Sequence, residues 1–170
     1  MKDGFLKAAA LSPALRVADC AYNVRQITDA LHKAAARGVK LAVFPEFCLT
    51  GYTCGDLFLQ RTLQTGALDA LSTLLDETKA LDVVTLVGLP LLVHGKLYNC
   101  AAVLCHGRIL GLVPKTYLPN YGEFYEKRQF TPGSTEVENV TVCGQEVPFG
   151  TSLLLSLIHI SEPTRRTPIS

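Results

Sequence analysis

The sequence predicts an α/β protein built as one domain. A chain of 170 residues is long enough for one substantial hydrophobic core and short for two domains. Hydrophobic residues make up 48% of the chain and charged residues 18%, as expected for a globular α/β protein. Short apolar runs also alternate with segments of helical periodicity, and the first three segments form a strand–helix–strand unit. Such a unit predicts a pair of parallel strands joined through a helix.

The first 44 residues contain this unit. Lys7–Leu11 is predicted to be a short buried strand that ends at Ser12-Pro13. A helix is expected next, with Asp19 as its N-cap and Gly38 just past its C-terminus. Leu41–Phe44 is the second predicted strand. The apolar face expected on the helix consists of residues at helical spacing: Val17, Ala21, Val24, Ile27, Leu31 and Ala35.

The remaining pattern predicts a helix, a strand and a hairpin. Phe58–Thr78 has leucines at helical spacing, and Asp82–Leu89 is a nearly continuous apolar run, typical of a strand covered on both faces. Leu97–Cys105 and Arg108–Val113 flank His106-Gly107, which predicts a hairpin with a two-residue turn. The last expected elements are a short polar helix around Glu123–Arg128, a turn at Thr131–Gly133, and strands near Val137–Val142 and Thr151–Leu154.

Composition narrows the range of partners. Sixteen basic and fifteen acidic residues leave a net charge of +1 with no charged block, which gives no support for a nucleic-acid or membrane partner. Asp3 and Lys7 interrupt the start of the chain, which makes it a poor signal peptide, and the weakly polar run Phe149–Ile160 is too short to span a bilayer. The six cysteines show no CxxC pair and no zinc spacing, so we expect reduced thiols, no metal site and a cytoplasmic protein.

The segment Leu41–Asp56, LAVFPEFCLTGYTCGD, carries the first candidate catalytic residue. Pro45 lacks an N–H group and favours an extended backbone at Phe44, so the strand should end there. Glu46 would then follow the carboxyl end of a buried strand, where open α/β folds bind their ligands. A carboxylate on an apolar floor is suited to act as a general base. A surface glutamate that opens a loop is the alternative on this segment alone.

Two further residues could act together with Glu46. Lys115 follows the predicted hairpin, and Glu123 lies in the loop beyond it. A lysine beside carboxylates in a cleft could stabilise developing negative charge, and loss of such a group typically costs about 3–4 kcal/mol of barrier. For Lys115, an exposed lysine at a strand end is the alternative.

Two stretches carry a family resemblance: FPEFCLTGY, which contains Glu46, and PKTYLPNYGEFYEKRQF, which contains Lys115 and Glu123. Their order resembles the nitrilase (carbon–nitrogen hydrolase) superfamily. Further matches at Tyr22-Asn23, LTGYTCGDLF and LPNYGEFYEKRQF resemble the N-terminal glutaminase domain of glutamine-dependent NAD synthetases. The resemblance covers roughly residues 5–154. It implies an αββα sandwich that is incomplete here, with later strands and helices missing, and a family that forms homo-oligomers.

The resemblance also implies roles for individual residues. Glu46 matches the general base of the family, Lys115 its catalytic lysine, and Glu123 its second glutamate. Tyr52 and Tyr121 match positions that line the glutamine pocket. The implied reaction is amide hydrolysis through a thioester. The base takes a thiol proton, the thiolate attacks the glutamine carboxamide, ammonia leaves, and water then releases glutamate.

The nucleophilic cysteine is absent from this chain. The family carries it in a motif like EICEDLW, which does not occur in the 170 residues. The implied whole protein passes ammonia to a C-terminal synthetase domain that uses ATP and Mg to amidate deamido-NAD, and no cofactor is expected in the amidase domain. We therefore expect an inactive part of an NAD synthetase. A free-standing amidase or carbamoylase of the same superfamily and a non-catalytic fragment are the alternatives.

The last residues differ in kind from the rest of the chain. Leu155–Arg165 can be back-translated into a DNA string that resembles a transposase adapter widely used in sequencing libraries. We therefore expect residues 155–170 to be a non-native tail and residues 1–154 to be a partial carbon–nitrogen hydrolase domain. A genuine disordered tail is the alternative.

Overall fold

The computed structural model describes residues 5–155. These residues form a seven-stranded mixed sheet, three α-helices and one 3₁₀ segment, η1. The elements in chain order are β1 (Ala8–Ala10), α1 (Cys20–Ala36), β2 (Leu41–Val43), η1 (Tyr52–Leu59), α2 (Arg61–Thr78), β3 (Val84–Val93), β4 (Lys96–Cys105), β5 (Arg108–Pro114), α3 (Glu126–Gln129), β6 (Glu138–Val142) and β7 (Gln145–Phe149).

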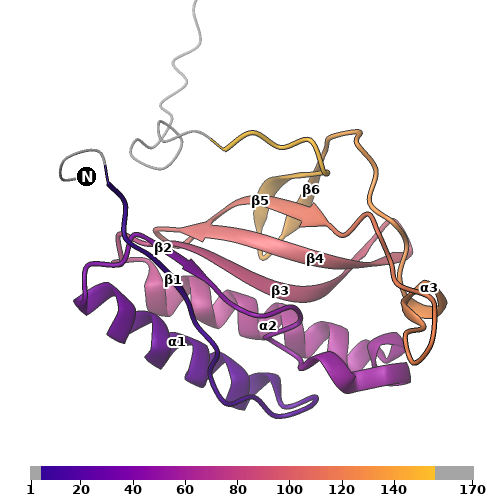
Figure 1. Ribbon diagram of the computed structural model, residues 1–170. Coiled ribbons are helices and arrows are strands. Elements are labelled where there is room, and N and C mark those ends of the chain that lie inside the picture. The colour runs from indigo at the N-terminus through magenta and orange to yellow at the C-terminus, as the bar shows by residue number, and fades with distance from the viewer. Residues whose placement is uncertain (1–4, 156–170) are drawn as a thin grey trace, which may run out of the picture.

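The strands are ordered β1-β2-β3-β4-β5-β7-β6 across the sheet. Helices α1 and α2 cover one face of this sheet, and the single-turn helix α3 lies beyond one end of β3 and β4 (Figure 1). On the face covered by the helices, Ala42 is fully buried. On the opposite face, Val43 is 40% exposed and its register partner Leu86 is partly exposed. The predicted α/β class is therefore confirmed, and the described residues supply one helical layer and one sheet layer.

The predicted strand–helix–strand unit is confirmed, but its first strand is not buried as predicted: Ala8 and Ala10 of β1 are exposed and Ala9 is partly exposed. Strands β1 and β2 pair in parallel, and β2 also pairs in parallel with β3. The carboxylate of Asp19 accepts a hydrogen bond from the Tyr22 N–H at 3.0 Å and caps α1. Past the end of α1 the chain turns at Gly38, whose φ of +77° a residue without Cβ adopts readily. Because the three strands are parallel, their carboxyl ends share one edge of the sheet, where Glu46 follows β2.

The predictions for the apolar face of α1 and for the start of α2 each need a correction. Val17 precedes α1 and is 53% exposed, and Ala21 is also exposed, so the apolar face does not begin where the periodicity placed it. Helix α2 begins at Arg61 rather than at Phe58, which lies in η1. The leucine-rich inner face of α2 is buried as predicted. The residues that α1 buries are Cys20, Asn23, Val24, Ile27, Leu31 and Ala34.

Three two-residue turns connect the antiparallel strands. His94-Gly95 joins β3 to β4, His106-Gly107 joins β4 to β5, and Cys143-Gly144 joins β6 to β7. Both residues of each turn have positive φ, which matches the right-handed twist of the flanking strands. The predicted hairpin is confirmed. The prediction of a last strand at Thr151–Leu154 is wrong. The chain turns directly after β6 and forms its last strand as β7.

Three remaining predictions concern the short helix α3, the tail and the membrane. The predicted polar helix around Glu123–Arg128 is shorter than expected and begins at Glu126. Apart from Leu155, the predicted non-native tail lies outside the described residues. Within residues 5–155, no helix combines the length and apolar character needed to cross a membrane.

Candidate active site

Three charged side chains converge at the carboxyl edge of the parallel strands. Glu46 follows β2, Lys115 follows β5, and Glu126 begins α3. The Nζ atom of Lys115 lies 2.8 Å from Oε1 of Glu46. The same Nζ lies 3.0 Å from both carboxylate oxygens of Glu126 and donates its hydrogen bond to Oε1. Two of the three predicted catalytic residues, Glu46 and Lys115, are therefore in contact.

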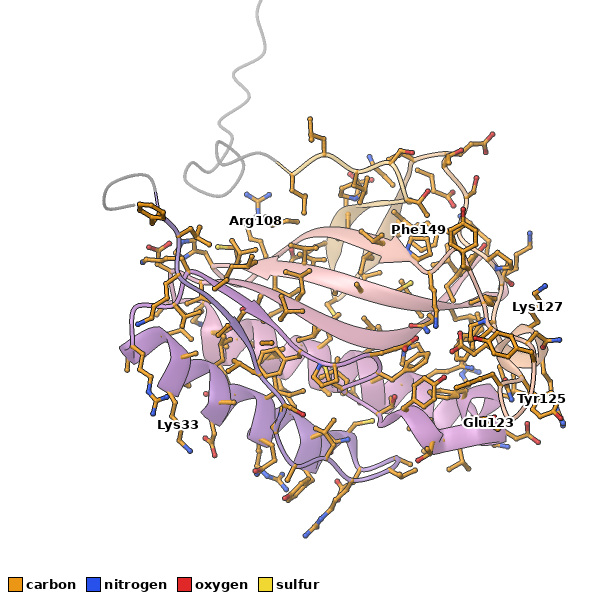
Figure 2. All side chains as sticks on the ribbon, in the orientation of Figure 1. Lys33, Arg108, Glu123, Tyr125, Lys127 and Phe149 are labelled. Atoms are coloured by element: carbon orange, nitrogen blue, oxygen red, sulfur yellow. The ribbon has the colours of Figure 1, made fainter. Side chains whose placement is uncertain are left out.

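The second carboxylate beside Lys115 belongs to Glu126 and not to Glu123. Glu126 is only 7% exposed, whereas Glu123 is exposed on the loop before α3, at the same end of the molecule as Tyr125 and Lys127 (Figure 2). The helical turn of α3 explains the difference: Glu126 lies one turn before the buried Phe130, on the same side of the turn. This i, i+4 relation to a phenylalanine is the pattern that could have identified Glu126 from the sequence.

Glu126 is held by Tyr52 as well as by Lys115. The Tyr52 hydroxyl, from η1, donates a hydrogen bond of 2.9 Å to Oε1 of Glu126. Burial, with the hydrogen bond and the charge of Glu126, raises the pKa of Tyr52 to about 12, so the phenol stays a neutral donor. Oε2 of Glu126 is buried and accepts no hydrogen bond within residues 5–155.

An aromatic cluster joins the three segments that carry Glu46, Tyr52 and Glu126. Phe47 lies next to Glu46, Phe58 lies in η1, and Phe130 follows α3. The ring centroid of Phe47 lies 4.7 Å from that of Phe58 and 5.1 Å from that of Phe130. Such aromatic pairs typically add about 0.5–1.5 kcal/mol beyond the burial of their area. The cluster therefore fixes the relative positions of the loop after β2, η1 and α3.

The backbone of Lys115 is held on both sides. Its N–H donates a hydrogen bond of 2.7 Å to the carbonyl of Asn99 in β4, and its carbonyl accepts one of 2.9 Å from the Gly133 N–H. Burial opposes the positive charge of the side chain, but the hydrogen bonds and charges of Glu46 and Glu126 outweigh it. The pKa of Lys115 is therefore raised above its ordinary value, and the side chain is an ammonium at neutral pH.

Two cavities flank these residues. One, of about 330 Å³, is lined by Glu46, Asn99, Lys115 and apolar residues of β2 to β5. The other, of about 270 Å³, is lined by Tyr52, Glu123, Glu126 and the aromatic cluster. Tyr52 therefore borders a cavity, and its role in binding glutamine stays a prediction. Tyr121 lines neither cavity, is 72% exposed, and packs its ring against Phe124 at a centroid distance of 5.8 Å.

The cysteines offer no activated thiol in the described part of the chain. Cys48, two residues after Glu46, is fully buried and accepts a hydrogen bond from the Gly88 N–H at 3.3 Å. Burial raises the pKa of Cys48 to about 12 and also raises that of Cys100, which borders the larger cavity. A thiol with a raised pKa is a poor nucleophile. Residues 5–155 also contain no group of three His, Cys, Asp or Glu side chains arranged to hold a metal ion.

The chain belongs to the carbon–nitrogen hydrolase family, whose model matches residues 7–154. The curated protein "Glutamine-dependent NAD(+) synthetase" of Mycobacterium bovis is 41% identical over 153 residues, which cover 90% of this chain and 22% of the relative. The corresponding protein of Thermotoga maritima is 33% identical over 93% of this chain and 31% of its own length. The chain thus spans between about a fifth and a third of the length of these relatives.

Solved structures confirm the fold. The crystal structure of a glutamine-dependent NAD(+) synthetase from Cytophaga hutchinsonii matches with a TM-score of 0.80 and 29% identity, over 85% of this chain and 25% of that one. An amidase from Nesterenkonia sp. matches with a TM-score of 0.66 and 23% identity, over 87% of this chain and 56% of that one. The predicted nitrilase-like α/β class and the predicted resemblance to NAD synthetases are confirmed.

Proposed function

We propose that the chain forms part of a glutamine-hydrolysing amidase site in a glutamine-dependent NAD synthetase. The observation that carries the proposal is the contact of one ammonium, Lys115, with two carboxylates, Glu46 and Glu126, at the edge of the parallel strands. The 41% identity to the Mycobacterium bovis synthetase supports glutamine as the substrate over other amides.

In the proposed reaction each residue has a distinct role. Glu46, 40% exposed at its side chain and bordering the larger cavity, takes the proton from the attacking thiol. Lys115 remains charged and stabilises the oxyanion that forms on the substrate carbonyl. Glu126 keeps Lys115 charged and in place, and Tyr52 orients Glu126. Glu126 thus takes the role of second glutamate that the resemblance assigned to Glu123. The thiol itself comes from a cysteine outside this chain.

The proposed whole protein uses the released ammonia to amidate deamido-NAD in an ATP-dependent synthetase domain, also outside this chain. A free-standing amidase or carbamoylase is the second candidate, and the shared fold of the Nesterenkonia amidase is compatible with it. An independent read of the gene beyond codon 154 separates the two. We expect a cysteine flanked by acidic residues and then an SGGxDS phosphate-binding loop. A frame without that loop would favour the free-standing amidase, and one that encodes residues 155–170 unchanged would overturn the non-native tail.

A glutaminase assay tests the chain as it stands. We expect the purified chain to release no ammonia from glutamine above background, because its described thiols are buried or lie away from Glu46. A Glu46→Gln variant serves as the matched control, and it should behave in the same way. A glutamine-dependent rate in the wild-type chain that disappears in Glu46→Gln would show that the nucleophile is present, and would overturn the proposed inactivity.

A further inference from the structure

One buried residue contacts both Glu46 and Lys115. Asn99 lies inside β4, is 4% exposed, and is a polar residue in an otherwise apolar part of that strand. Its side-chain Nδ2 donates a hydrogen bond to Oε1 of Glu46. Its main-chain carbonyl accepts the hydrogen bond from the Lys115 N–H at 2.7 Å. Asn99 is therefore linked to the carboxylate by its side chain and to the lysine by its backbone.

These contacts make the two oxygens of Glu46 unequal. Oε1 accepts hydrogen bonds from both Asn99 Nδ2 and Lys115 Nζ. Within residues 5–155, no hydrogen bond to Oε2 of Glu46 is formed. Because a carboxylate is planar, two donors fixed on Oε1 also set the direction of Oε2. The donor from Asn99 comes from the middle of a paired strand, where backbone hydrogen bonds to β3 and β5 restrict its movement.

We propose that Asn99 is the positioning residue of this site. It fixes the orientation of Glu46 relative to Lys115 and leaves Oε2 as the oxygen that takes the proton. The inference rests on the roles proposed above for Glu46 and Lys115. Asn99 acts through Glu46 and touches no reacting atom. If its side-chain donor is removed, the carboxylate rotates away from its fixed orientation, and Lys115 loses part of its pairing while Glu126 stays in place.

The reactivity of the Lys115 amine reports on this arrangement in the chain as it exists. Only the uncharged amine is acetylated, so pairing with carboxylates slows the reaction. We would treat the chain with trace acetic anhydride at mildly alkaline pH and measure Lys115 by peptide mass spectrometry, with the exposed Lys33 as internal reference. The variants are Asn99→Leu, which replaces the amide with an apolar side chain of similar shape, and Glu46→Gln. The matched control is Asn23→Leu, since Asn23 is equally buried but bonds to Arg16 and Leu49.

We expect Asn99→Leu to raise the relative labelling of Lys115 to a value between those of the wild-type chain and Glu46→Gln. Asn23→Leu should leave it unchanged even if stability falls. If Asn99→Leu labels at the wild-type level while Glu46→Gln labels faster, the positioning role of Asn99 is overturned and the proposed function is not. Wild-type labelling in Glu46→Gln would overturn the ion pair on which the proposed function depends.

If Asn99→Leu fails to fold, Asn99→Ala replaces it. The side-chain amide resonance of Asn99 in the wild-type chain gives a second measurement that needs no variant of Asn99. Its protons should move upfield in Glu46→Gln, because the carboxylate that accepts their hydrogen bond has become a neutral amide. An unchanged amide resonance would contradict the contact and overturn the proposal.

Discussion

Gly88 provides the sharpest prediction about how the fold positions Glu46. A Cβ atom added to this residue of β3 would lie 2.3 Å from the Phe47 nitrogen, 3.0 Å from the Glu46 carbonyl carbon and 3.1 Å from the Glu46 Cα. All three are backbone atoms, which cannot rotate aside as a side chain can. Gly88→Ala therefore has to displace the segment that carries Glu46, and a single added methyl group tests whether that segment is free to move.

The contact distances set the expected magnitude. The segment must retreat by about 1 Å to reach an ordinary contact, which displaces Glu46 from its position beside Lys115. The retreat also strains the hydrogen bond of 3.3 Å from the Leu49 N–H to the Gly88 carbonyl. Overpacking and one weakened hydrogen bond together predict a loss of about 2–4 kcal/mol in the free energy of unfolding.

Urea unfolding followed by far-UV circular dichroism measures this loss, since the chain contains no tryptophan. Acetylation of Lys115 on the same samples reports whether Glu46 has moved, and we expect it to increase. Gly66→Ala is the matched control. A Cβ at this position of α2 would meet the Cys20 sulfur at an ordinary 3.6 Å, and alanine favours a helix over glycine by about 1 kcal/mol.

Two results would refute this reasoning. A Gly88→Ala chain that unfolds at the wild-type urea midpoint would show that the loop after β2 accommodates the methyl group without strain. A destabilised chain with unchanged labelling of Lys115 would show that the strain is absorbed elsewhere and that Gly88 does not position Glu46.

The other predictions concern the partners of Lys115. Glu126→Gln should lower the free energy of unfolding by about 1–2 kcal/mol and increase acetylation of Lys115. The control Glu123→Gln should change the free energy of unfolding by no more than about 0.5 kcal/mol in the same urea assay. Equal effects of the two variants would contradict the assignment of Glu126 as the partner of Lys115. Because the pKa of Tyr52 rises from 10 to about 12 on folding, its contribution to stability is complete below pH 10 and is lost as the pH rises toward 12. Tyr52→Phe should therefore flatten the loss of stability above pH 10, while Tyr117→Phe, at an 88% exposed site, should leave that slope unchanged.

The secondary structure was largely predictable because its determinants are local. Pro45 ends β2, Asp19 caps α1, and His106-Gly107 forms a turn with positive φ at both residues. The error in the last strand arose because a two-residue turn was missed. Cys143-Gly144 is a turn of the same kind as His106-Gly107, and its omission displaced the last strand to Thr151–Leu154.

The candidate site was predictable only in part. Glu46 and Lys115 follow strand ends, a position that marks functional residues in α/β folds, and family motifs surround both. Glu123 and Glu126 lie in the same short polar segment, and in the sequence only the i, i+4 spacing of Glu126 from Phe130 distinguishes them. Asn99 is visible only as a polar residue in an apolar strand, which by itself is equally consistent with an ordinary buried amide.

The sequence by itself determined most of the strands and helices in their order along the chain, the carbon–nitrogen hydrolase family, and Glu46 and Lys115 as candidate catalytic residues at strand ends. The tertiary structure decided that Glu126 is the second carboxylate beside Lys115, and that Asn99 links Lys115 to Glu46. The reason is chain distance: Glu46 contacts Asn99 and Lys115 across 53 and 69 residues. Local periodicity shows which face of an element is buried. Contacts over such separations depend on how the sheet twists and on how the short helix α3 docks, and only the packed fold specifies both.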